Sequence, residues 1–99
     1  MRYEFDADVW VWDARKNDTW TFLSLPQEDS DEIREYAAGI PRGFGSVRVE
    51  ATIGGTTWRT SIFPGGGGAP YVLPLKKAVR AAESLGVGDS ARVRVELLD

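Results

Sequence analysis

The chain of 99 residues contains no cysteine and no histidine. Without cysteine, a disulfide framework and a thiolate metal site are excluded. Without histidine, the chain cannot form a Ser-His or Cys-His catalytic pair, and it lacks the most common general base and transition-metal ligand. An enzyme built on this chain would have to use Asp, Glu, Lys, Tyr or Arg. We therefore expect a non-catalytic domain without a metal or a cofactor.

Long apolar runs are missing as well. No stretch approaches the ~20 apolar residues of a membrane-spanning helix, and the N-terminus lacks the basic-then-apolar pattern of a signal peptide. The hydrophobic content of 42% and charged content of 27% are ordinary for a folded globular protein. We expect one domain over residues 1–99, located in the cytoplasm and away from the membrane.

Charge is distributed unevenly along the chain. The net charge is −3, but residues 1–38 carry 4 basic and 10 acidic side chains, whereas residues 39–99 carry 8 basic and 5 acidic ones. Such regions can attract each other between copies, although solvated faces of mixed sign explain the same pattern. The sequence leaves a monomer and a homodimer open.

Apolar and polar residues alternate with period two in several segments, which predicts a mainly β fold. The expected strands are residues 3–12, 19–25, 46–53, 56–63, 71–73 and 90–98. Two short helices are expected over residues 28–38 and 75–85. For the first helix we predict a capping box of Asp29 and Glu32. For the second we predict a buried stripe of Leu75, Ala78, Val79, Ala82 and Leu85.

The element order is strand-strand-helix-strand, repeated twice. Sliding the sequence along itself so that Leu25-Pro26 falls on Leu73-Pro74 also places Trp10 on Trp58, and a slightly smaller shift aligns the closing strands. Each half, about 1–53 and 54–99, is too small to bury a core alone, so the halves must pack together. This pattern predicts a small, partly open β-barrel with helices at its ends.

Two tryptophans, Trp10 and Trp12, fall on the polar face of the first strand. If exposed, such large aromatic side chains mark a contact surface; alternatively, a helix, a hairpin or a partner subunit covers them. The first interpretation makes the domain a binding module for a small molecule or a protein partner. The predicted ligand-binding residues are Trp10, Trp12, Trp58, Arg59, Arg42 and Phe44.

Three short motifs have simpler explanations. "RGFGSVRV" (Arg42–Val49) is close to an RNA-recognition signature, but serine and valine replace two of its aromatic residues and the element order differs. Asp6 and Asp8, which share one strand face, are more typical of a solvated surface than of acid–base catalysis. "GGGG" (Gly65–Gly68) leads into a strand rather than a helix, so we expect a mobile hairpin loop, able to act as a flap over a pocket, and not a phosphate loop.

Larger segments carry a resemblance to a known family. These segments are "RGFGSVRVEATIGGTTWRTSIFP", the Leu-Pro before each helix, "KKAVRAAESLGVGD" and "RVRVEL". Over Tyr3 to Leu97 the chain resembles a bacterial domain family of unknown function, found alone or N-terminal to YdeI-type, bacteriocin-protection-associated domains. The resemblance implies a double-split β-barrel of the AbrB-like fold class, with no catalytic residues to carry over.

The AbrB-like resemblance raises nucleic-acid binding as the alternative function. The basic residues available for it are Arg42, Arg48, Arg59, Arg92 and Arg94. Phosphate binding by these residues would weaken steeply with salt. The acidic first half of the chain argues against it, so we rank nucleic acid below a small molecule or protein as the partner.

Overall fold

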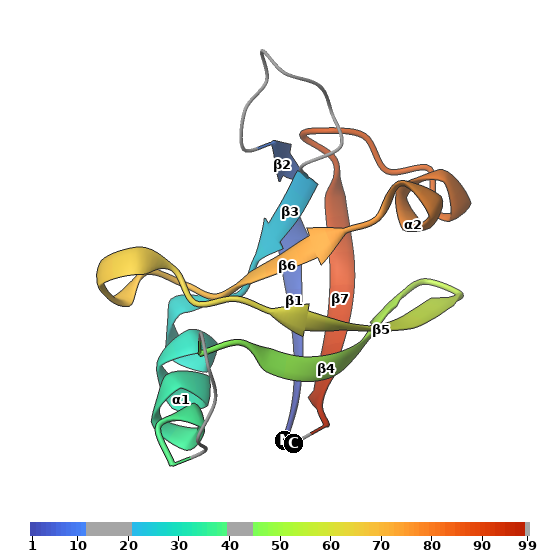
Figure 1. Ribbon diagram of the computed structural model, residues 1–99. Helices are drawn as coiled ribbons and strands as arrows, with labels where there is room; N and C mark the ends of the chain where they lie inside the picture. The colour runs from blue at the N-terminus through green and yellow to red at the C-terminus, as the bar shows by residue number, and fades with distance from the viewer. Residues whose placement is uncertain (12–20, 40–44, 99) are drawn as a thin grey trace.

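The computed structural model describes residues 1–11, 21–39 and 45–98, which form two antiparallel β-sheets with helices at opposite ends of the molecule (Figure 1). The large sheet has the order β1 (Arg2–Asp8), β7 (Ser90–Leu97), β4 (Val47–Ile53), β5 (Thr56–Ile62). The small sheet has the order β2 (Trp10–Val11), β3 (Thr21–Ser24), β6 (Val72–Leu75). The helices are α1 (Gln27–Ala37) and α2 (Lys77–Ala82), with a 3₁₀ turn η1 (Gly66–Gly68). The predicted mainly β fold with two short helices is confirmed.

Period-two alternation places the core on one face of the large sheet. In β7 every second side chain is buried, and the residues between them are exposed. β4 shows the same inward pattern and pairs with β7 along five residue pairs. Because both strands are central in the sheet, their inward side chains form the middle of the core, namely Val47, Val49, Ala51, Ile53, Ala91, Val93, Val95 and Leu97.

The first predicted strand is divided between the two sheets at Val9. Its backbone N–H donates to the carbonyl of Asp89, and its carbonyl accepts from the N–H of Gly88. Val9 is buried, and the chain then enters the small sheet, where Trp10 pairs with Phe22. Period two continues through the crossing, which is why the alternation in the sequence did not reveal it. The hairpin predicted between residues 3–12 and 19–25 therefore forms in the described residues only between β2 and β3.

Two prolines stand where the sheets meet. The backbone N–H of Leu25 donates to the carbonyl of Tyr71, on the β6 side of the chain. Because successive residues of a strand direct their N–H groups to opposite sides, the backbone nitrogen of Pro26 is directed to the side of β1. At the other junction Phe63 and Val72 form an isolated bridge, in which the N–H of Val72 donates to the carbonyl of Phe63. Pro74 is two residues further on, so its backbone nitrogen is directed to the same side of β6 as the N–H of Val72. Proline has no N–H to donate, so neither junction can continue as a regular ladder past these positions.

The predicted barrel is accordingly not closed. The described residues form two open antiparallel sheets, connected through the chain at Val9 and by the bridge between Phe63 and Val72. The two prolines supply a physical reason, because closing a barrel needs continuous pairing around its circumference.

Both helices form in the predicted regions, but the predicted cap of the first and the predicted length of the second are wrong. α1 begins after Pro26 with no side-chain cap, so the capping box of Asp29 and Glu32 does not form. α2 is shorter than predicted because Leu75 ends β6. Of the predicted stripe in the second helix, Leu75 and Val79 are buried and Leu85 is half-buried, while Ala78 and Ala82 are exposed. A six-residue helix turns too few side chains toward the core to bury the full stripe.

Candidate functional site

A depression of about 430 Å³ lies over the junction between β1 and β3. Pro26 lies on its wall, and the missing ladder at this proline leaves room that a continuous sheet would fill. We call it the seam depression. Its lining residues are Asp6, Ala7, Asp8, Ser24, Pro26 and Ser90.

Two carboxylates and two hydroxyls give the seam depression its chemistry. Asp6 and Asp8 are on the exposed face of β1, where the period of two places them side by side. Asp6 Oδ2 lies 3.5 Å from Arg92 Nη1, and both side chains are mostly exposed. Asp8 faces Ser90 in the strand register, and Ser24 lies across the junction. This arrangement can accept hydrogen bonds and attract a positive charge.

An aromatic pair adjoins the seam depression through Ser24. The indole Nε1 of Trp10 donates to Ser24 Oγ at 2.9 Å. The ring of Trp10 lies 5.1 Å from that of Phe22, tilted by 33°. Trp10 is half-buried, so the structure gives it a hydrogen-bonding partner and a packing partner beside the depression.

The other predicted ligand-binding residues lie elsewhere. Trp58 is on the inward face of β5, packed against the core, with its buried Nε1 lacking a hydrogen-bond partner among the described residues. Arg59 is on the outward face, with its Nε 3.6 Å from Glu50 Oε2. The structure therefore brings neither residue to Trp10, which belongs to the small sheet. The remaining three, Trp12, Arg42 and Phe44, lie outside the described residues.

Of the arginines considered for nucleic-acid binding, Arg42 lies outside the described residues, and the other four share the outward face of the large sheet with carboxylates. Arg92 is paired in register with Asp6, and Arg94 with Glu4. Arg59 is likewise opposite Glu50. Because carboxylates stand opposite these arginines, this face has no continuous positive stripe, within the described residues, along which a phosphate backbone could lie.

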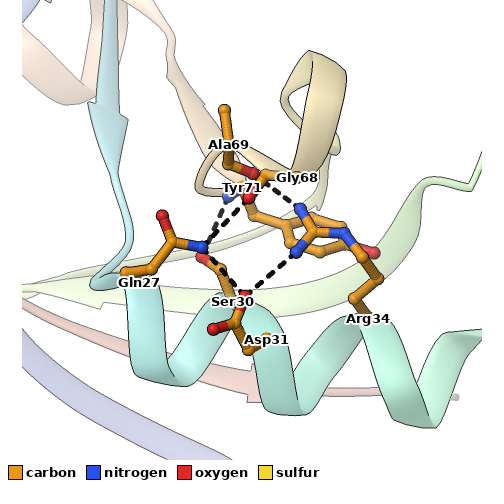
Figure 2. Close-up of polar contacts among 7 residues, drawn as sticks. All are labelled: Gln27, Ser30, Asp31, Arg34, Gly68, Ala69 and Tyr71. Carbon is orange, nitrogen blue, oxygen red and sulfur yellow. Dashed lines mark hydrogen bonds and ion pairs between the residues drawn. The ribbon is translucent and has the colours of Figure 1, made fainter.

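The glycine-rich loop is held against α1 (Figure 2). Gln27 Nε2 donates to the carbonyl of Gly68 at 3.0 Å, and Arg34 Nη2 donates to that of Ala69 at 2.6 Å. Asp31 accepts from both side chains and orients them. These contacts give the predicted mobile loop a defined position, and no residue of η1 lines the depression.

The same network continues into the core through Tyr71. Its backbone N–H donates to the hydroxyl of Ser30 at 2.9 Å, and both residues are buried. The guanidinium of Arg34 lies over the Tyr71 ring, 5.3 Å from its centroid. Burial raises the pKa of the Tyr71 hydroxyl, and the positive charge of Arg34 partly offsets this. The network is structural, because its polar groups satisfy one another.

Sequence reasoning missed Ser24 and Ser90. Both are small hydroxyl residues at strand ends, and nothing in the linear pattern connects positions so far apart. Pro26 is a usable signal in the sequence, because a proline has no N–H to donate and so marks the end of a strand ladder. In the described parts of the chain, no group of three acidic, cysteine or histidine side chains could hold a metal ion, and no helix is long and apolar enough to cross a membrane.

Comparison with known proteins places the chain in a family but gives no activity. No curated protein matches it. The sequence model of the family described as "Domain of unknown function (DUF1905)" matches residues 5–95, which include both helices, the small sheet and all of the large sheet except the first residues of β1 and the last of β7. Because this match covers nearly the whole chain, the protein belongs to the DUF1905 family.

Proposed function

We propose that this domain is a non-catalytic binding module that holds a positively charged group, such as an ammonium or a guanidinium, in the seam depression. The observation that carries the proposal is the convergence of two carboxylates and two hydroxyls in a depression of about 430 Å³. Of the predicted ligand-binding residues, we retain Trp10 in this role. A small molecule or a protein side chain would bind by the same chemistry.

The chemistry of the lining supports this ligand class. Asp8 faces only a serine in its strand register, unlike Asp6, which is near Arg92. A cation entering the depression can therefore pair with Asp8 without displacing an arginine. The aromatic pair of Trp10 and Phe22 offers a nearby π surface, which attracts cations by about 0.5–1 kcal/mol at exposed sites. Exposed ion pairs contribute about 0.2–1 kcal/mol each, so we expect weak binding by a single side chain and tighter binding by a larger ligand.

We also propose that the fold is a double-split β-barrel, in which the prolines open the two junctions. The strand pairings support this, since the large sheet, the bridge, the small sheet and the crossing at Val9 form a complete circuit. A cytoplasmic location remains part of the same proposal, in keeping with a chain that uses no cysteine.

The proposal can be tested by NMR titration with defined probes. The cationic probes are Nα-acetyl-lysine methylamide and Nα-acetyl-arginine methylamide, and the neutral probe is Nα-acetyl-norleucine methylamide. We expect only the cationic probes to shift the amide signals of Asp6, Asp8 and Ser24 and the indole signal of Trp10. Equal shifts from the neutral probe, or shifts confined to other residues, would refute the proposal.

A pair of matched variants separates the seam depression from general electrostatics. Asp8→Asn should weaken binding of the arginine probe by about two- to fivefold, because it removes one exposed charge pair. Glu96→Gln makes the same charge change on the same sheet face outside the depression, and it should leave the affinity unchanged. Equal losses in both variants would show that net charge, rather than the depression, attracts the probe.

A further inference from the structure

The outward face of α2 is a shallow basic groove. Val79 is the buried residue of this helix, and the opposite face carries Lys77 and Ala81, which are exposed. A depression of about 350 Å³ follows this face. Small side chains give it room, and positive charge borders it. Its lining residues are Lys77, Arg80, Ala81, Ser84, Leu85 and Gly86.

The outward face of α1 is acidic over its whole length. Ser30 and Ile33 are turned to the core. The opposite face carries four exposed carboxylates at helical spacing, namely Glu28, Asp31, Glu32 and Glu35. Burial, and then the neighbouring carboxylates of Glu28 and Glu32, raise the pKa of Asp29 on the same helix.

The two faces cannot meet within one molecule. Figure 1 shows α1 and α2 at opposite ends, on either side of the two sheets. We propose that α1 of one copy docks against the α2 groove of a second copy, so that the domain associates head to tail. The small side chains Ala81 and Ser84 allow a helix to approach closely, Lys77 lines the groove, and the exposed Lys76 directly precedes α2.

The stoichiometry follows from this geometry. A contact between different surfaces leaves an unused α1 at one end of the pair and an unused α2 at the other, so association continues unless a ring closes. The attraction between exposed charges is screened within about 10 Å at 0.1 M salt. We therefore expect weak, salt-sensitive association whose average mass does not stop at that of a dimer.

Sedimentation velocity over a concentration series tests this directly. At about 20 mM NaCl the average mass should rise above the 10.9 kDa of the monomer, and about 0.5 M NaCl should lower the association constant at least about tenfold. A mass of 10.9 kDa at every concentration and salt condition would overturn the proposal. So would a closed dimer that persists at high salt.

Charge-reversed variants identify the two surfaces. The α1 variant is Glu28→Lys with Glu35→Lys, and the α2 variant is Lys76→Glu with Lys77→Glu, all at exposed positions. Each variant alone should lose association at least about tenfold, because the α1 variant no longer has a net negative α1 and the α2 variant has lost the two lysines at the start of α2. An equal mixture of the two should associate again, since the unmodified α2 of the α1 variant meets the unmodified α1 of the α2 variant. No recovery in the mixture would refute docking between these helices.

A control variant addresses net charge, and circular dichroism establishes that each variant is folded. Glu4→Lys with Glu96→Lys makes the same charge change as the α1 variant, but on the outward face of the large sheet. It should associate like the unmodified protein. If it loses association as fully as the α1 variant, long-range charge rather than helix docking drives the contact.

Discussion

The two halves of the chain, residues 1–53 and 54–99, pair their strands in the same pattern with different side chains. β1 pairs with β7 in the way that β5 pairs with β4. The pairs β4–β7 and β3–β6 each join the corresponding strands of the two halves. β2 pairs with β3, and the corresponding contact in the second half is the single bridge between Phe63 and Val72. Exchanging the halves therefore leaves the set of pairings unchanged.

The registers indicate which residues correspond. Ala51 and Val95, which the alignment of the closing strands superposes, pair with each other; Val95 also pairs with Tyr3, and Ala51 with Trp58. Tyr3 and Trp58 thus occupy corresponding positions. The small sheet leads to the same result. When the β2–β3 register is continued, the residue that corresponds to Phe63 of the bridge with Val72 is separated from it in sequence by the same number of residues as Tyr3 is from Trp58. The register therefore favours Tyr3, rather than Trp10, as the residue that corresponds to Trp58.

This correspondence explains an orphaned donor. Both Tyr3 and Trp58 are half-buried and pack against the core. The Tyr3 hydroxyl donates to Glu32 of α1 at 2.8 Å. When the two Leu-Pro pairs are aligned, α2 carries Arg80 in place of Glu32, and a guanidinium cannot accept a hydrogen bond. The buried Nε1 of Trp58 consequently has no partner among the described residues. Similar backbones can support different polar networks.

The largest expected effects test whether the halves are equivalent in the core. Leu25 and Leu73 correspond in the Leu-Pro alignment and are 1% and 0% exposed. Leu25→Ala and Leu73→Ala should each lower the free energy of unfolding by about 2–5 kcal/mol, through lost burial and a cavity. Urea denaturation measures both. If one variant loses several times more stability than the other, the cores of the halves are not equivalent.

The second comparison concerns a buried hydrogen bond between the halves, to which the first half contributes a side-chain acceptor. Ser30 is buried and accepts from the Tyr71 N–H, whereas Ala78, its counterpart in the Leu-Pro alignment, is exposed. Ser30→Ala should destabilise the protein by about 1–3 kcal/mol, because a buried donor loses its acceptor. Ala78→Ser should change stability by less than about 0.5 kcal/mol. Equal effects in urea denaturation would contradict this asymmetry.

The parts of the fold that sequence predicted are those governed by local period. In β7 each second residue is buried, so alternation specified both the strand and its inward face. The crossing at Val9 was not predictable, because period two is preserved on both sides of it. Ala78 was expected inside because it falls at helical spacing with Leu75 and Val79, but alanine carries no strong signal for either environment, and the length of α2 decided its exposure.

The candidate site was less predictable than the fold. Asp6, Asp8 and Trp10 were visible as one strand face, but the seam depression needs Ser24 and Ser90 as well. These residues meet only through the strand order of two sheets. A linear sequence gives their chemistry, whereas tertiary pairing gives their convergence.

A smaller effect should distinguish the glycine-rich loop from other surface segments. Arg34 holds the carbonyl of Ala69 and lies over Tyr71, while its counterpart in the second half is Ala82, whose side chain can make neither contact. Arg34→Ala should accelerate hydrogen exchange in residues 65–70 while lowering global stability by about 1 kcal/mol or less. Arg59→Ala, which removes an exposed arginine from β5, is the control. Unchanged exchange in Arg34→Ala would show that the loop holds its position without α1.

The smallest expected effect is a pH dependence at Tyr3, which Trp58 cannot share. Burial, the hydrogen bond to Glu32 and the negative charges of Glu32 and Asp29 raise the pKa of the Tyr3 hydroxyl well above its usual value. The folded state therefore holds this proton more tightly than the unfolded state. The resulting stabilisation is complete below the ordinary tyrosine pKa of about 10 and decreases as pH rises above it. Tyr3→Phe should remove this part of the decrease in thermal midpoint between about pH 9 and 11. Trp58→Phe, the corresponding change in the second half, should leave the pH dependence intact. If Tyr3→Phe loses stability with pH as steeply as the unmodified protein, the hydroxyl is not the group that titrates.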